Sequence, residues 1–163
     1  MNSKPHVRRR ALIVGGALAA SIVLAAVGIA GATPPGGTST AVVIADGNTA
    51  NTVHINVDPI KLTTKESAEV FQVSNTAEPG FTSGWHMHTG PVIVNVTAGS
   101  LTFYEANCRT TVVTAPGAYI ERTARPILAR NEGSVGAAWV TTQIIPVGAS
   151  KRVDVVAGFC GIS

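Results

Sequence analysis

From Ala41 onward the sequence consists of short runs rich in Val, Ile and Thr that are separated by Gly, Pro and Asn. No stretch shows the 3.6-residue apolar period of an amphipathic helix. Runs of this kind are typical of β-strands, and a succession of them predicts an all-β sandwich or barrel. The expected strands are 42–45, 53–58, 68–74, 84–88, 91–98, 101–106, 110–114, 118–121, 126–130, 135–146 and 153–156.

The segment 11–30 carries no charge and directly follows Arg8, Arg9 and Arg10. A basic cluster before a hydrophobic run is the order found in secretory signals, and Ala30-Gly31-Ala32 is a suitable cleavage site. The segment is also long enough to cross a bilayer as an uncleaved helix. We therefore expect residues 1–32 to be a signal peptide or a membrane anchor. Either alternative places the protein outside the cytoplasm, secreted or in the cell envelope.

One domain is expected after this segment. Residues 33–40 are rich in Pro, Gly and Thr, which is typical of a flexible linker. Residues 41–163 then have the length of a single domain. From Thr33 onward, eight basic residues face nine acidic ones, so the domain lacks the basic surface that nucleic-acid binding requires. Contact with a membrane is expected only through an uncleaved N-terminal segment.

The chain contains two cysteines, Cys108 and Cys160. In an exported protein such a pair predicts a disulfide, because the surroundings are oxidising. Two separately buried thiols are the alternative.

The segment Gly84-Trp85-His86-Met87-His88 carries the most informative pair of side chains. Residues at i and i+2 of a strand project from the same face, so both imidazoles could bind one metal ion. Two histidines alone make a weak site, since transition metals normally take three or more protein ligands. The alternative is a pair of surface or hydrogen-bonded histidines.

The spacing of Gly80, His86, His88 and Gly99 resembles the first sequence motif of the cupins, and Asn131 fits the end of their second motif. The resemblance covers about residues 53–146. It implies a double-stranded β-helix, a jelly-roll barrel with a ligand pocket at its mouth.

Cupins usually hold their metal with two histidines and a glutamate from the first motif and a histidine from the second. The glutamate position is Val92 in this chain, and the second-motif histidine position is Ile127. The resemblance therefore implies a degenerate metal site formed by His86 and His88, which binds at most one divalent transition metal, and weakly. The pocket residues expected beside it are Val92, Val94, Ile127 and Asn131.

Three other side chains have the chemistry of a replacement ligand: His54, Glu105 and Glu121. We expect each to face solvent, as polar residues on half-exposed strands usually do. Trp85 and Trp139 are expected to pack inside the barrel rather than line a ligand site.

Two functions remain open. The favoured one is an exported cupin-domain protein that binds a small ligand in the barrel pocket without catalysis. The alternative is a metal-dependent cupin enzyme of the dioxygenase or isomerase class, which requires a carboxylate beside the two histidines. The sequence identifies no catalytic residue, and a homodimer remains open.

Overall fold

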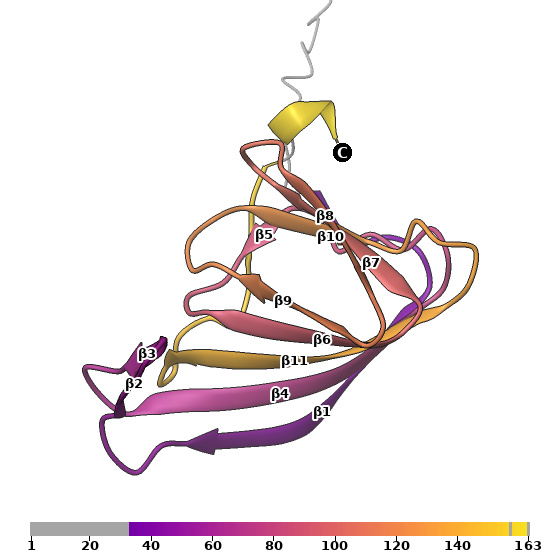
Figure 1. The fold of residues 1–163 in the computed structure, drawn as a ribbon. Helices are drawn as coiled ribbons and strands as arrows, with labels where there is room; N and C mark the ends of the chain where they lie inside the picture. The colour runs from indigo at the N-terminus through magenta and orange to yellow at the C-terminus, as the bar shows by residue number, and fades with distance from the viewer. Residues whose placement is uncertain (1–32, 157, 163) are drawn as a thin grey trace, which may run out of the picture.

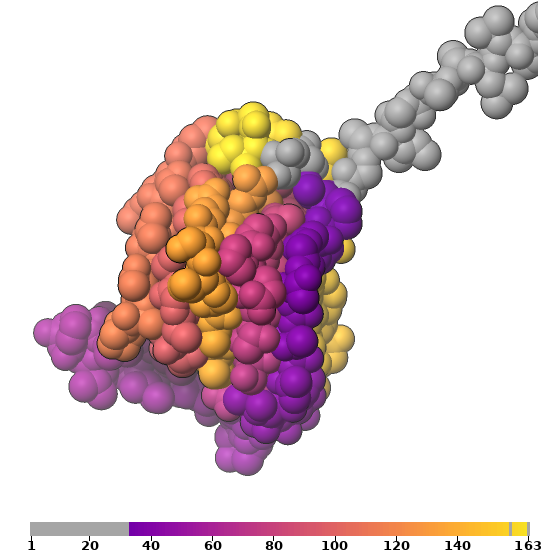
Figure 2. Space-filling view, turned by 90° about the vertical axis from the view of Figure 1, so that its right-hand side faces the viewer, coloured from indigo at the N-terminus to yellow at the C-terminus, as the bar shows by residue number. Residues whose placement is uncertain are grey.

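The computed structural model describes residues 33–156 and 158–162. It consists of two five-stranded antiparallel sheets that face each other, with a small hairpin projecting from the barrel (Figure 1, Figure 2). The strands are β1 (Ser39–Asn48), β2 (His54–Val57), β3 (Ile60–Thr63), β4 (Ala68–Ala77), β5 (His86–Met87), β6 (Val92–Ala98), β7 (Ser100–Glu105), β8 (Thr110–Thr114), β9 (Gly117–Glu121), β10 (Ile127–Arg130), β11 (Ala137–Pro146) and β12 (Val153–Asp154). A short 3₁₀-helix, η1, covers Phe159–Gly161.

The strand order is that of a jelly roll. One sheet runs β1-β4-β11-β6-β9 and the other runs β12-β5-β10-β7-β8. From β4 to β11 the chain crosses from one sheet to the other at every step except β7 to β8, which form a hairpin. The eight strands β4 to β11 thus form the double-stranded β-helix, and β1 and β12 each extend one sheet at its edge. The predicted all-β fold class is confirmed.

The core lies between the two sheets and follows from strand alternation. On β6, Val92, Val94 and Val96 are at most 2% exposed, whereas Asn95 and Thr97 face solvent. The ring of Phe103 stacks on Tyr119 from the opposite sheet at 4.2 Å between centroids. Apolar side chains at every second position therefore fill the barrel, as the sequence pattern predicts.

A C-terminal segment wraps the outside of β5. The backbone N–H of Val155 donates to the carbonyl oxygen of Trp85 at 3.1 Å. The indole N–H of Trp85 donates to the carbonyl oxygen of Ile162 at 2.8 Å, and its ring lies 5.0 Å from that of Phe159. Trp85 is fully buried by these contacts. The C-terminal segment thus covers the outer side of the strand that carries the histidines.

A disulfide joins Cys108 to Cys160, with their Cα atoms 5.4 Å apart. It ties the C-terminal segment to the loop between β7 and β8. The predicted pairing is confirmed, and the described residues contain no free cysteine.

The N-terminal part of the described chain lies against the domain. Gly36 and Thr82 exchange two backbone hydrogen bonds of 2.9 and 3.0 Å, and β1 begins at Ser39. Part of the segment predicted to be a flexible linker is therefore paired with the barrel. The hydrophobic segment predicted at residues 1–32 lies outside the described residues. In the described part of the chain no helix is long and apolar enough to span a membrane.

Candidate metal centre

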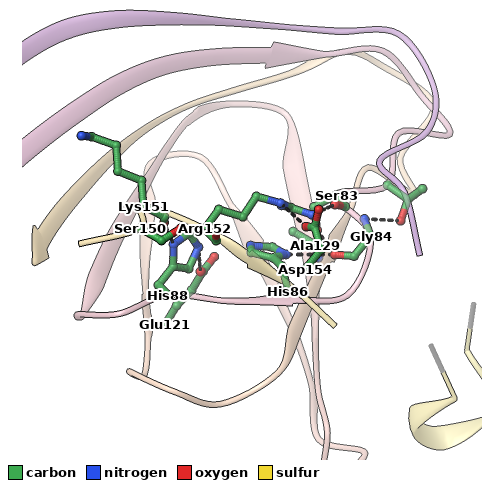
Figure 3. Close-up of polar contacts among 11 residues, drawn as sticks. Ser83, Gly84, His86, His88, Glu121, Ala129, Ser150, Lys151, Arg152 and Asp154 are labelled. Atoms are coloured by element: carbon green, nitrogen blue, oxygen red, sulfur yellow. Dashed lines mark hydrogen bonds and ion pairs between the residues drawn. The ribbon is translucent and has the colours of Figure 1, made fainter. Parts of the chain in front are cut away.

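His86, His88 and Glu121 form a cluster between the two sheets. Each offers one ligand atom, and the three atoms lie within 4.8 Å of one another. The histidines come from β5 and its following residue, and Glu121 ends β9 in the facing sheet (Figure 3). All three residues are buried, at 5%, 8% and 6% exposure. The cluster thus combines two imidazoles and a carboxylate in an environment shielded from water.

Backbone carbonyls fix the orientation of both imidazoles. The Nδ1 of His86 donates to the carbonyl oxygen of Gly84 at 2.9 Å, and the Nδ1 of His88 donates to that of Lys151 at 2.6 Å (Figure 3). Because a carbonyl only accepts, the proton of each neutral ring is on Nδ1 and the lone pair is on Nε2. Metal-binding histidines are commonly held in this way.

The carboxylate of Glu121 has an unsatisfied oxygen. Its Oε2 lies 3.1 Å from the Nε2 of His88, and with the proton of His88 on Nδ1 both of these atoms are acceptors. Among the described residues, no donor satisfies this buried Oε2. A buried acceptor without a donor is costly, and a cation shared with Nε2 would satisfy both atoms. The donor set therefore fits a divalent transition metal.

Burial lowers the pKa of His86 to about 4, although the negative charge of Glu121 opposes the shift and the positive charge of Arg152 adds to it. The ring is therefore neutral at pH 7 and its Nε2 lone pair is available to a metal ion without loss of a proton.

A cavity of about 370 Å³ adjoins the cluster. Its apolar wall includes three phenylalanines and a tryptophan, and its polar wall contains Gln143 and Arg152 in addition to the cluster itself. The apolar lining side chains include Phe71, Phe81, Val94, Leu101, Phe103 and Trp139. Cavities of this size and character bind small organic molecules.

The predicted pocket residues divide into two groups. Val94 lines the cavity. Val92, Ile127 and Asn131 are not among its lining residues, because they are buried in or beside the core. The amide of Asn131 donates to the carbonyl oxygens of Ala77 and Val135, at 3.2 and 2.9 Å. Asn131 thus holds backbone segments together.

The register of the sheets explains how the cluster forms. Ile127 pairs with His86 across β10 and β5, and Val92 pairs with Glu121 across β6 and β9. Directly opposed residues of antiparallel strands have side chains on the same face. Glu121 therefore projects into the barrel beside Val92, and the neighbouring strand supplies a carboxylate next to the position where the resemblance places the glutamate.

The expectation that Glu121 faces solvent is wrong. The signal available in the sequence was alternation along β9, which puts Glu121 on the same side as Tyr119. The structure shows that this side faces the core, because the ring of Tyr119 packs on Phe103. The other two candidates stay outside the cluster. Glu105 accepts a hydrogen bond from the hydroxyl of Tyr119 at 3.0 Å, and His54 is exposed on β2. The two histidines predicted from the sequence thus have a third potential ligand beside them in Glu121.

The two tryptophans also differ from each other. Trp139 lines the cavity, and its ring lies 5.6 Å from that of Phe81. Trp85 points to the other side of β5, beneath the C-terminal segment. Trp85 thus packs without lining the cavity, as expected, but outside the barrel, whereas Trp139 packs inside it and also forms part of the cavity wall.

The strand order, in which β4 to β11 alternate between two facing sheets, is that of a double-stranded β-helix. No protein-family model matches the sequence, and no curated protein matches it.

Several solved structures are similar to the barrel described above. A protein with a double-stranded β-helix domain from Klebsiella pneumoniae is 20% identical, with 66% of this chain and 82% of that chain covered and a TM-score of 0.48. A cupin-like protein from Thermotoga maritima is 15% identical, with 54% and 65% covered and a TM-score of 0.49. A cupin 2 conserved barrel domain protein from Leptotrichia buccalis is 10% identical, with 66% and 41% covered and a TM-score of 0.49.

Proposed function

We propose that this protein is an exported, metal-dependent enzyme that binds one divalent transition metal through His86, His88 and Glu121 and acts on a small molecule in the adjoining cavity. The observation that carries the proposal is the unsatisfied Oε2 of Glu121, within 4.8 Å of ligand atoms on two imidazoles held by backbone carbonyls. Two histidines and one carboxylate leave coordination positions open for substrate, as in non-heme iron oxygenases.

When bound, the metal would supply Lewis acidity or redox chemistry at its open positions. The chain's own residues prepare the site for it. The carbonyl groups of Gly84 and Lys151 orient the imidazoles, burial keeps His86 neutral, and the apolar wall excludes water from the reacting molecule.

The lining residues favour the oxygenase class over the isomerase class. Once His86, His88 and Glu121 are used as ligands, the described cavity wall contains no further carboxylate or imidazole. A proton-transferring isomerase needs a general base within reach of its substrate, and the remaining amine of the wall, Lys151, is paired with Glu69. An oxygenase does not depend on such a base. Capture of a ligand without catalysis is the second candidate, and the apolar wall alone supports it.

The extracytoplasmic location is supported by two independent features. Residues 1–32 have the sequence pattern of an export signal or anchor, and the Cys108–Cys160 disulfide suits an oxidising compartment.

The metal content of the purified protein tests the proposal. Mass spectrometry after dialysis should find about one transition metal ion per chain, and Glu121→Gln should weaken metal binding by about tenfold or more. Glu105→Gln is the matched control, because Glu105 is a partly buried carboxylate outside the cluster. Far less than one ion per chain in the wild type, or equal metal binding in Glu121→Gln, would contradict the proposal.

The same preparation distinguishes the two functions. Oxygen uptake by the iron-loaded protein with a bound small molecule supports the oxygenase. Binding of small molecules with no turnover under any metal supports the capture function instead.

A further inference from the structure

Arg152 brings a positive charge to the cavity wall next to His86. It immediately precedes β12, which pairs with β5 so that Val153 lies opposite Met87 and Asp154 opposite His86. Figure 3 shows the Arg152 side chain reaching across His86 toward Ser83. A charge at this place faces any molecule bound in the cavity beside the cluster.

The guanidinium of Arg152 is held in place at two points. Its Nη2 donates to the carbonyl oxygen of Ser83 at 2.6 Å, and its Nε donates to the Oδ1 of Asp154 at 2.6 Å. Ser83 is itself fixed to Ala129 by two hydrogen bonds, of 2.8 and 2.9 Å. The guanidinium is therefore positioned before a ligand arrives, which lowers the entropy cost of binding.

This arrangement leaves donors for a ligand. A guanidinium has five N–H groups. Two of them serve Ser83 and Asp154, and no other hydrogen bond of this guanidinium is seen among the described residues. The second cation of the cavity wall, Lys151, differs because its Nζ pairs with Glu69 and points away from the cluster (Figure 3).

The charges around the cavity also favour an anion. The two imidazoles are neutral when they act as ligands, so a divalent ion with Glu121 leaves one net positive charge in the cluster. Arg152 and Asp154 balance each other beside it. A ligand with one negative charge would make the buried site neutral, and a guanidinium binds a carboxylate with good geometry.

We propose that the ligand of this cavity is a small organic acid, with a compact apolar body against the aromatic wall and a carboxylate bound by Arg152. The inference rests on the proposed function, since the metal supplies the charge that the acid balances. It adds the class of substrate and identifies Arg152 as the residue that recognises it.

Calorimetric titration of the metal-loaded full-length protein with benzoate tests the inference, and benzamide is the neutral probe of the same shape. We expect benzoate to bind about tenfold or more tightly than benzamide. Arg152→Gln should remove this preference while the metal content stays at the wild-type level. Arg109→Gln is the control, because Arg109 is an exposed arginine outside the cavity wall, and it should keep the preference.

The outcomes separate the two proposals. A wild-type protein that binds no metal contradicts the proposed function. A metal-loaded wild type that binds both probes equally, or a folded Arg152→Gln variant that keeps the preference for benzoate, overturns the inference alone. If Arg152→Gln does not fold, Arg152→Lys keeps the charge without the paired donors, and an undiminished preference for benzoate in that variant also overturns the inference.

Discussion

His86 makes the stability of the metal-free protein depend on pH. Its pKa is about 4 in the folded chain against 6.5 for the unperturbed group, so between these values the unfolded chain binds more protons. The free energy of unfolding therefore falls as the pH falls through this window. We expect a loss of about 2 kcal/mol between pH 7 and pH 5.

Urea denaturation in the presence of a chelator measures this loss. His86→Gln should remove it, because glutamine does not titrate, whereas the exposed-histidine control His54→Gln should retain it. An unchanged pH dependence in His86→Gln would show that another group is responsible.

Gln143 is a buried residue whose side-chain oxygen lacks a hydrogen-bond donor among the described residues. It is 7% exposed, lines the cavity, and its Oε1 has no donor among the described residues. Removal of an unpaired buried polar group stabilises a protein, so Gln143→Leu should raise the free energy of unfolding by about 1 kcal/mol. Thermal and urea denaturation of the metal-free protein would measure the change.

Gln72→Leu is the comparison for this prediction. The Nε2 of Gln72 donates to the Oγ1 of Thr142 at 3.0 Å, so the same substitution removes a satisfied hydrogen bond and should destabilise the protein. If both variants are destabilised equally, the amide of Gln143 has a partner in solution.

The limit of sequence reasoning about the site is visible at Glu121. The placement of His86 and His88 on one face follows from local alternation along a single strand. The approach of Glu121 depends instead on how β6 and β9 pair, and on how the two sheets face each other. Sequence spacing does not fix either arrangement, so a residue 33 positions beyond His88 could not be assigned to the cluster.

At the level of elements, the strands were mostly predictable because Gly, Pro and Asn separate short β-rich runs. β3 was missed. The prediction treated 53–58 as one isolated strand, whereas the chain turns at Asp58-Pro59 and pairs Val57 with Ile60. β3 is too short for its sequence to reveal it. Its four residues contain one polar residue, Lys61, between two apolar ones before Thr63, which is too little to recognise an alternating pattern.

The Cys108–Cys160 disulfide stabilises the C-terminal segment against the barrel. It closes a separation of 52 residues, for which the loss of chain entropy in the unfolded state corresponds to about 4 kcal/mol. The double substitution Cys108→Ser with Cys160→Ser should lower the free energy of unfolding by roughly this amount. It should also speed hydrogen exchange at the indole N–H of Trp85, which is bonded to Ile162.

The wild-type protein under reducing conditions should behave like the double variant. Cys108→Ser alone serves as a check, since one substitution already prevents the bond. A double variant with wild-type stability and unchanged exchange at Trp85 would mean that packing alone holds the C-terminal segment.

At the level of the whole molecule, we predict that the chain is exported and cleaved after Ala32, so that the mature protein begins at Thr33. The sequence Ala30-Gly31-Ala32 is a suitable cleavage site, and Gly36 is already hydrogen-bonded to Thr82 of the barrel. Gly84 has a positive φ of 66°, and any side chain there would collide with the backbone of Thr33 and Pro34. Mass spectrometry of material isolated from outside the cytoplasm checks this boundary, and a retained segment 1–32 would favour the membrane anchor.

The hydrogen bond from His88 to Lys151 joins residues 63 positions apart. During synthesis the histidine strand therefore emerges well before the carbonyl that orients it. The segment that contains Lys151 is in turn secured by a disulfide that forms only under oxidising conditions. Both imidazoles and Glu121 are thus synthesised before the Lys151 carbonyl that orients His88, so the cluster reaches the described geometry only when the C-terminal segment has packed beside β5.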